Sequence, residues 1–415
     1  MSSRVRVAAS QSESAGDARR RSVGKRTVIV LAALGTFAPL STDMYLAGFP
    51  ELAQGFGTSV GEVQLSLSLF LLGLAIGQLF YGPVIDGWGR KLPLVSGVAF
   101  FAAISLSIVF APNIETFLVL RFLQAVGGCA GMVVGRAIIS DLYDKQEAAT
   151  LLSSVMAIQA LAPIVAPVIG GYVTATAGWH SIFALLAGIG FVCLLAVILT
   201  IPESLPSSAR QRESLSQTLT NYGQLLANRS FLLPAIVGGL SFAVGFAFVS
   251  GSSFIYMTLY GVSAEVYGWL FALNAVGIIV GAILNGAMLR RINSRCATTI
   301  SLATCLAAAS VLFLFGSDMP LVLLMGLFFM CSLTLPITGA NTVALALAAS
   351  GNHRGGGSAI VGVMQFVCAG LAATAVGLFN DGSMTAVTGT MLAGALISLM
   401  VWSFAKRGLT SKGDD

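Results

Sequence analysis

Charged side chains are scarce in this sequence. Lys, Arg, Asp and Glu make up 9% of its 415 residues, whereas hydrophobic residues make up 56%. Roughly a quarter of the residues in an ordinary soluble domain are charged, so this composition excludes such a domain and predicts a chain embedded in lipid. The net charge of +5 follows the membrane topology described below and gives no case for nucleic-acid binding.

Histidine is also rare, and the cysteines do not cluster. The two histidines are His180 and His353, and the six cysteines (129, 193, 296, 305, 331 and 368) lack metal-ligand spacing. Scattered cysteines within apolar runs are typical of small hydrophobic filler. We therefore expect no metal site and no cofactor. A membrane enzyme acting on lipid would need a nucleophile or a metal cluster, and it is the weakest functional interpretation.

The few charges divide the chain into long uncharged runs. About 20 apolar residues cross a roughly 30 Å hydrocarbon core, and each of these runs is long enough to form a membrane-spanning helix. The run 148–202 is too long for one crossing, and Gly178 predicts a turn within it, near Thr174–Trp179. The sequence therefore predicts an all-α membrane protein with twelve spans, at 27–49, 63–85, 92–111, 115–139, 148–173, 180–201, 230–257, 265–288, 297–316, 319–348, 357–379 and 384–405.

Lysine and arginine gather on one side of this topology. They occur in the N-terminal tail, at the C-terminus and after every even-numbered span, whereas the opposite loops carry only acids such as Glu51 and Asp318. The positive-inside rule then predicts that both termini are cytoplasmic. Residues 1–26 are rich in Ser, Ala and Arg, as transit segments are, but the first apolar run lacks a convincing cleavage site. We expect a disordered cytoplasmic tail there.

The longest polar segment between spans, 202–229, has six spans on either side. It predicts a cytoplasmic linker between two six-helix bundles, 27–201 and 230–405, with a short cytoplasmic tail at 406–415. In such duplicated bundles the substrate binds between the halves. We expect a monomer.

The loop after the second span reads "GPVIDGWGRK". Glycine permits a tight turn at the membrane face, and an acid there can accept backbone hydrogen bonds or pair with a cation. The loop resembles the signature loop of the major facilitator superfamily, with Gly87 where the family often has a basic residue. The residues that carry the resemblance are Gly82, Asp86, Gly89, Arg90 and Lys91.

In that family the loop latches the two halves together on the cytoplasmic side. The resemblance implies that Asp86 lies against the start of the eleventh span, near Gly357 and Ser358, with Arg136 as a further partner. Two simpler interpretations stay open. The loop could serve only as a topology anchor, and Arg136 could be a snorkelling side chain at the membrane face.

Two opposite charges lie deep within spans. Asp43 stands in "APLSTDMYLAGFP", ~24 Å above the inner face, and Arg121 stands in "LRFLQAVGG", ~21 Å above it. Each is too costly to expose to lipid, so we predict a buried ion pair in which a proton on Asp43 frees Arg121. The alternative is a static structural pair. Arg121 with Gln124 resembles the superfamily's fourth-helix motif, although Ala125 replaces the usual glycine.

The fifth span carries "QALAPIVAPVIGGYV". Its prolines and glycines predict a helix that bends and packs closely, and a kinked helix with no other purpose is the alternative. The stretch also resembles the antiporter motif of drug-exporting facilitators, with alanine in place of the first glycine. The residues concerned are Pro163, Pro167, Gly170 and Gly171.

Together these motifs resemble the bicyclomycin/chloramphenicol-resistance (Bcr/CflA) family. The resemblance implies the major facilitator fold and a proton-coupled antiporter that exports small amphiphilic drugs, amphenicol- or bicyclomycin-like, across a bacterial cytoplasmic membrane. Its partners would be the drug, protons and the lipid bilayer. A proton-coupled uptake symporter of a small metabolite on the same fold is the alternative.

A drug cavity needs apolar walls with a few polar groups. Each candidate, taken singly, could equally serve in helix packing. The candidates are Tyr45, Gln124, Gln159, Phe248, Tyr256, Asn274, Asn341 and Gln365.

Overall fold

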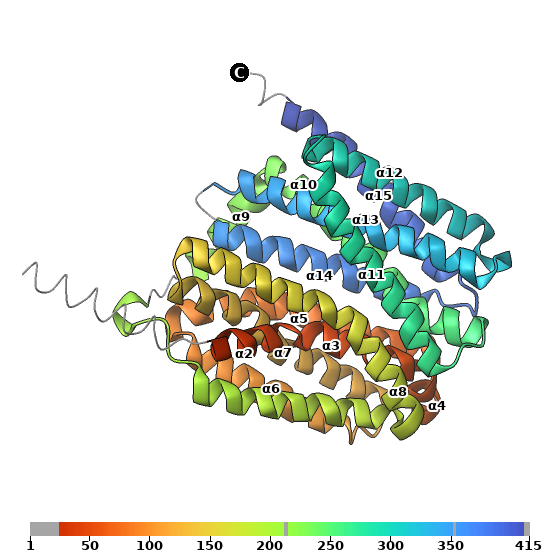
Figure 1. Ribbon diagram of the computed structural model, residues 1–415, viewed down its shortest axis with the longest axis horizontal. Helices are drawn as coiled ribbons and strands as arrows, with labels where there is room; N and C mark the ends of the chain where they lie inside the picture. Colours follow the sequence, from red (N-terminus) through yellow and green to blue (C-terminus); the bar gives the residue numbers. More distant parts are fainter. Residues whose placement is uncertain (1–24, 211–214, 352–353, 411–415) are drawn as a thin grey trace, which may run out of the picture.

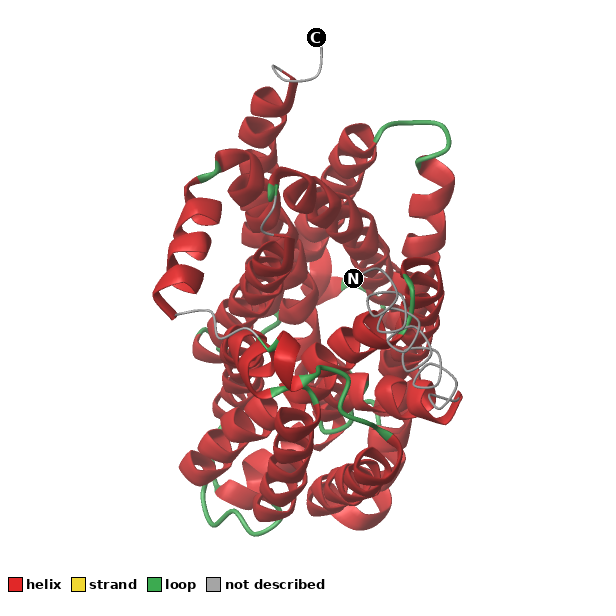
Figure 2. Ribbon diagram, turned by 90° about the vertical axis from the view of Figure 1, so that its left-hand side faces the viewer, coloured by secondary structure: helices red, strands yellow, loops and turns green. Residues whose placement is uncertain are grey.

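The computed structural model describes residues 25–210, 215–351 and 354–410, and Figure 2 shows these ranges as helices and connecting loops without strands. Eleven helical stretches in these ranges are long and apolar enough to cross a membrane. One of them, Gln146–Thr200, is interrupted at Gly178, where the backbone takes φ 75° and ψ 169°. The stretch therefore forms two spans, which gives twelve membrane helices and confirms the predicted fold class.

The N-terminal half is defined here as residues 25–200. Its helices begin at polar caps: Ser59, Asn113 and Asp144 each accept a hydrogen bond from a backbone N–H in the first turn. The elements are α2 (Lys25–Gly35), α3 (Phe37–Asp43), η1 (Leu46–Gly48), α4 (Phe49–Phe56), α5 (Val60–Trp88), α6 (Lys91–Ile108), α7 (Ile114–Leu142) and α8 (Lys145–Thr200).

The first span differs from the predicted continuous helix at 27–49. It is interrupted at Thr36 and again at Met44–Tyr45, and it continues to Phe56. Pro39 explains the first interruption, because proline has no N–H to donate to the carbonyl one turn earlier. The second interruption leaves Asp43 as the last residue of α3.

The C-terminal half is defined as residues 229–410, and the segment before it holds more structure than a polar linker predicts. η2 (Ser207–Ala209) and α9 (Leu215–Ala227) lie within the expected linker, and the last helix extends to Thr410, inside the expected tail. Leu225 of α9 is buried against Phe231 and Ile360. The remaining elements are α10 (Arg229–Ser253), η3 (Phe254–Leu259), α11 (Ala264–Met288), α12 (Ser294–Phe315), η4 (Gly316–Asp318), α13 (Leu321–Ala349), α14 (Arg354–Leu378) and α15 (Thr385–Thr410).

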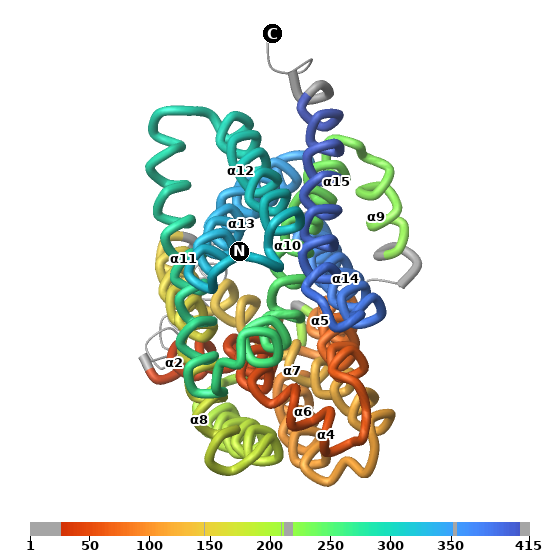
Figure 3. Tube along the Cα trace, turned by 90° about the vertical axis from the view of Figure 1, so that its right-hand side faces the viewer, coloured from red at the N-terminus to blue at the C-terminus, as the bar shows by residue number. Residues whose placement is uncertain are grey.

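The two halves meet along two helix pairs. α14 packs against α5, and α11 packs against the part of α8 that precedes Gly178. Figure 1 shows α11 beside this part of α8, and Figure 3 shows α14 directly above α5, with the C-terminal half above the N-terminal half. Glycine permits the first contact, because a Cβ on Gly61 would lie 2.6 Å from the Gly377 carbonyl oxygen. In the second pair, a Cβ on Gly268 would lie 2.5 Å from the carbonyl oxygen of Pro167. Small residues thus let the halves close on each other.

Gly268→Ala is expected to part α8 from α11 at this contact. The added methyl group overpacks a backbone-to-backbone approach, which costs about 1–3 kcal/mol. A cysteine introduced at Met44, which is 1% exposed beneath α8, should then react roughly tenfold faster with a thiol reagent, since 1.4 kcal/mol is tenfold. Gly286→Ala is the matched control on α11, because a Cβ there meets no atom within 4 Å. Equal labelling rates in both variants would contradict this account of the seam.

Candidate functional site

A cavity of about 270 Å³ lies between the two halves. Its walls are mostly apolar and aromatic, as small-molecule sites are, and among the residues that the structure describes Asp43 is the only carboxylate in its lining. The N-terminal half contributes Gly35, Ala38, Pro39, Thr42, Asp43, Leu71, Leu74, Met132, Gln159 and Pro163. The C-terminal half contributes Phe242, Gly245, Phe246, Phe248, Val249, Phe271, Asn274, Ala275, Ile278, Ser332, Leu335 and Phe366.

Three of the eight predicted substrate residues line this cavity: Gln159, Phe248 and Asn274. The other five, Tyr45, Gln124, Tyr256, Asn341 and Gln365, are not among its lining residues. Four of these five are buried in contacts within one half. Tyr45 shares a hydrogen bond with Ser66, Gln124 donates to Ser105, Tyr256 accepts from Asn274, and Asn341 donates to Asn285.

Several phenylalanines of the cavity were missed by sequence reasoning. Phe242 and Phe246, together with Val249, recur at helical spacing on α10 and place one face of that helix on the cavity. Phe271 and Asn274 do the same on α11. The periodic pattern was a usable signal, but an apolar face in a membrane helix serves equally for packing or for lipid contact.

Asp43 is placed at the cavity by the end of α3. Its side chain is 6% exposed, and it accepts a 2.8 Å hydrogen bond from the hydroxyl of Thr42. Within the described part of the chain, no Lys, Arg or His nitrogen lies within 4.0 Å of its carboxylate. A carboxylate without a cation, facing a largely apolar cavity, is a strong candidate for reversible protonation.

Arg121 is enclosed in an aromatic box. Its side chain is 0% exposed, and its guanidinium carbon lies 4.1 Å from the ring centre of Tyr45, 4.4 Å from that of Phe70 and 5.5 Å from that of Phe183. It donates to the Ser41 carbonyl at 2.8 Å and to the side-chain oxygen of Gln124. Rings and carbonyl dipoles thus stabilise this cation.

The predicted ion pair between Asp43 and Arg121 is therefore wrong in this structure. The similar membrane depth that the helix rise predicts for the two residues agrees with the structure, since Arg121 donates a hydrogen bond to the carbonyl of Ser41, two residues before Asp43. The guanidinium binds the backbone there because Ser41 lies in the last turn of α3, where helical N–H donors run out. Asp43 lines the cavity, whereas Arg121 points into the N-terminal half.

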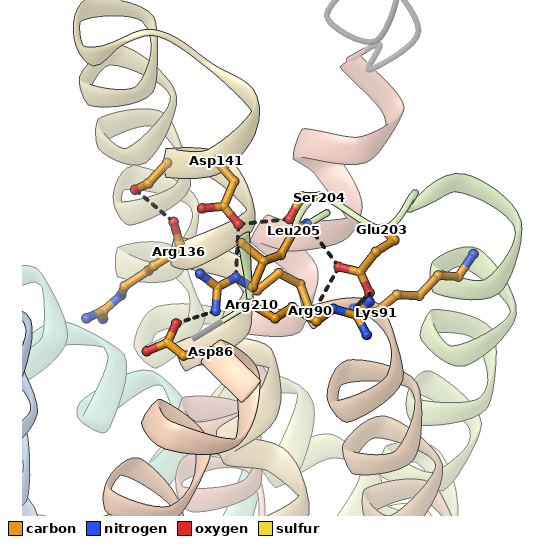
Figure 4. Close-up of polar contacts among 10 residues, drawn as sticks. Asp86, Arg90, Lys91, Arg136, Asp141, Glu203, Ser204, Leu205 and Arg210 are labelled. Atoms are coloured by element: carbon orange, nitrogen blue, oxygen red, sulfur yellow. Dashed lines mark hydrogen bonds and ion pairs between the residues drawn. The ribbon is translucent and has the colours of Figure 1, made fainter. Parts of the chain in front are cut away.

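Charged residues form a network at the loop between α5 and α6 (Figure 4). Arg90 donates to Asp86 at 2.6 Å and to Asp141 at 2.9 Å. Burial alone would lower the pKa of Arg90, but the hydrogen bonds and charges of Asp141 and Asp86 more than offset it and raise the pKa. Asp141 also accepts from the hydroxyl of Ser204 at 2.9 Å. The network therefore joins the loop, the end of α7 and the start of the linker.

Glu203 was missed by sequence reasoning and holds the centre of this network. Its carboxylate accepts hydrogen bonds from the backbone N–H groups of Arg90 at 2.8 Å and Lys91 at 3.3 Å, and it pairs with Arg210 at 3.6 Å. An acid at the start of α6 is favourable for the helix dipole. A lone acid directly after the sixth span, on the side where basic residues gather, was the available signal.

The expected cross-half contact of Asp86 is not formed. Asp86, in the last turn of α5, pairs with Arg90 at the start of α6, and in the part of the chain that the structure describes no hydrogen bond joins Asp86 to Gly357 or Ser358. Arg136 is exposed, and Figure 4 shows its side chain pointing away from the network. The physical reason is proximity, because Arg90 follows Asp86 by only four residues, just beyond the end of α5.

The other residues of the predicted latch have separate places. Gly89 takes φ 92°, a conformation that favours glycine, whereas a Cβ on Gly82 would meet nothing within 4 Å. The ammonium group of Lys91 donates to the carbonyl of Ile198 at 3.1 Å.

The proline and glycine motif of α8 makes the close contacts that its sequence predicts. Pro163 and Pro167 stand inside the helix, and the backbone leaves helical geometry only at Gly178. Gly170 abuts the Met44 carbonyl beside Asp43, and Gly171 abuts the Ala264 carbonyl of the other half. These glycines thus place α8 against both the interrupted first span and α11.

Glu203→Ala is expected to loosen the network. It removes the acceptor for two N–H groups at the start of α6, which costs about 1–2 kcal/mol in the free energy of unfolding. Trypsin should cleave after Arg210 faster, and the thermal unfolding midpoint in detergent should fall. Glu115→Ala, at an exposed acid in the first turn of α7, is the control and should change both by much less. An unchanged cleavage rate in Glu203→Ala would show that the linker is held by other contacts.

Comparison with known proteins agrees with this architecture. The model of the Major Facilitator Superfamily matches residues 31–373. The uncharacterized MFS-type transporter YdgK of Bacillus subtilis is 36% identical over 92% of this chain and 95% of its own. A bicyclomycin resistance protein homolog of Haemophilus influenzae is 29% identical over 93% and 98%. The structure of a bacterial homolog of the human lysosomal transporter Spinster, 15% identical, matches 92% of this chain and 96% of its own with a TM-score of 0.73 and shares the fold.

Proposed function

The chain belongs to the Major Facilitator Superfamily, and we propose that this member is a proton-coupled antiporter that exports small amphiphilic drugs, amphenicol- or bicyclomycin-like, by alternating access. It is a multi-pass membrane transporter and not an enzyme. The proposal concerns the coupling ion, the substrate and the direction of transport.

One observation carries the proposal. Asp43 is a nearly buried carboxylate that lines an apolar cavity between the halves, and no cation from the described ranges of the chain is paired to it. Its ionised form is costly in such surroundings unless water or a ligand compensates it, so proton binding and ligand binding there affect each other. In an alternating-access protein the cavity opens to one side at a time, and Asp43 would exchange protons with each side in turn.

The substrate class is supported by the cavity and by one relative. Phenylalanines from the C-terminal half suit an apolar, aromatic compound, and the few polar groups suit a compound with limited polarity. The relative from Haemophilus influenzae is named for bicyclomycin resistance. The bacterial relatives support a bacterial cytoplasmic membrane, with the arginine-rich loops on the cytoplasmic side.

The transport cycle then follows from competition between the drug and the proton at Asp43. Drug binds from the cytoplasm to the state with ionised Asp43, the halves rock, and a proton from outside binds Asp43 and favours drug release. Arg121 takes a different role from the one predicted. It holds the end of α3, which carries Asp43, through the Ser41 carbonyl.

Transport by inverted membrane vesicles tests this function. Labelled chloramphenicol should accumulate inside inverted vesicles when their interior is acidic, and accumulation should stop when the pH difference is dissipated. Vesicles without the protein are the control. Loss of preloaded drug driven by the same pH difference would instead indicate an uptake symporter. Equal accumulation with and without the pH difference would exclude proton coupling.

A further inference from the structure

Asn274 carries an unused hydrogen-bond acceptor beside the cavity. The residue lies on α11, is 3% exposed and lines the cavity. Its side-chain nitrogen donates to the carbonyl of Leu270 at 3.1 Å and to the hydroxyl of Tyr256 at 3.4 Å. Its side-chain oxygen is buried and has no hydrogen-bond partner among the residues that the structure describes. A buried acceptor of this kind is rare in a folded protein and calls for a donor.

The orientation of this amide follows from its neighbours. The Leu270 carbonyl can only accept a hydrogen bond, so the group that faces it must be the NH₂ of Asn274. A flipped amide would set two oxygens against each other and leave the NH₂ without its partner. The unpartnered group of Asn274 is therefore its carbonyl oxygen, an acceptor with no donor capacity.

The facing half adds a second acceptor. The Thr42 hydroxyl lies 2.8 Å from the Asp43 carboxylate and 3.1 Å from the Pro39 carbonyl, so its single hydrogen serves two acceptors. Asp43 therefore also has unused acceptor capacity. Acceptors from both halves lie at the cavity, and the lining residues in the described part of the chain include no Lys, Arg or His.

We propose that Asn274 selects substrates that carry a hydrogen-bond donor. The substrate class is an aromatic amphiphile with a hydroxyl, amide N–H or ammonium group at one end. That end binds the Asn274 carbonyl and Asp43, and the aromatic end packs on phenylalanines such as Phe246, Phe248 and Phe271. The proposal rests on the transport function proposed above. A site with a buried acceptor discriminates against an analogue that lacks the donor, because the acceptor is then left unpaired.

Two pairs of compounds test this selection with the purified full-length protein. Biphenyl-4-ylmethanol is compared with its methyl ether, and biphenyl-4-ylmethylammonium with its N-trimethyl counterpart. Each pair keeps its ring system and charge and differs in donor capacity. Titration calorimetry in detergent should show roughly tenfold tighter binding of the donor in each pair, as one hydrogen bond in a buried site provides. Asn274→Leu should weaken this preference, because Asp43 is then the only one of the two proposed acceptors that remains, and it should still bind the methyl ether.

Phe271→Leu is the matched control, three residues away on the same face of α11. It should weaken all four compounds by a similar factor and keep the donor preference. Asn274→Ser is a second variant in case Asn274→Leu does not fold, and the wild-type protein alone already decides between equal and unequal binding. Equal affinities within each pair in the wild type, or a donor preference of wild-type size in both Asn274 variants, would overturn the proposal.

Vesicle transport of the same compounds separates this inference from the proposed function. A donor preference in binding without proton-driven transport would reject the antiporter and leave Asn274 as the selecting residue. Proton-driven transport without a donor preference would support the antiporter and reject Asn274 as the selecting residue.

Discussion

Asp43→Asn is expected to abolish proton-driven accumulation of drug while drug binding persists. The amide has nearly the same shape as the carboxylate and can still accept a hydrogen bond from Thr42, but it cannot take up a proton. In the wild type, proton and drug oppose each other at Asp43, so drug affinity should fall as the pH falls. In Asp43→Asn, affinity should be independent of pH between about 5 and 8, because the carboxylate has been removed.

The size of this effect follows from the coupling. With one proton per drug, a pH difference of about 1.5 units sustains a drug gradient of about 30-fold, since each pH unit is worth 1.36 kcal/mol. The variant should give a ratio close to one. Asp318→Asn is the control, because this exposed acid lies in η4 and outside the cavity. A wild-type drug gradient in vesicles with Asp43→Asn would assign the coupling to another group.

Much of this fold could be predicted from the sequence, because solvation in lipid leaves few options. A long uncharged run must satisfy its backbone internally and becomes a helix. The turn at Gly178 was predictable for a similar reason, since the uncharged run 148–202, 55 residues long, is too long to cross once. The interruption of the first span was not predicted. Pro39 was visible, but prolines within a membrane span can also be accommodated, as Pro163 and Pro167 are in α8.

The partners of the charged residues were harder to predict than their depth. Helix rise placed Asp43 and Arg121 at one level, but it does not say which way each side chain points. The aromatic rings around Arg121 come from α5, α8 and the segment after α3, three parts of the chain that only the packed structure brings together. The same holds for Glu203, which reaches its backbone partners across 112 and 113 residues of sequence.

Arg121→Met is expected to destabilise the protein and to stop transport. Methionine fills part of the same volume but leaves the Ser41 carbonyl and the Gln124 side-chain oxygen without their donor. Two buried acceptors that lose a charged donor cost about 3 kcal/mol or more in the free energy of unfolding. The end of α3 would no longer be held, and Asp43 would lose its place at the cavity. Thermal unfolding in detergent and drug export in vesicles are the measurements.

The pH profile of drug binding then separates two roles for Arg121. If it positions α3, Arg121→Lys should recover part of the stability, because an ammonium group still reaches the Ser41 carbonyl but lacks the planar fork. The pH at which drug affinity falls should then stay near the wild-type value in both Arg121→Lys and Arg121→Met. A counter-ion of Asp43 would behave differently, since Arg121→Met would move that pH upward by one unit or more, about the effect of one nearby opposite charge. Arg291→Met, at an exposed position after α11, should change neither property. An upward shift in Arg121→Met with unchanged stability would restore the ion pair as the working state of the transporter.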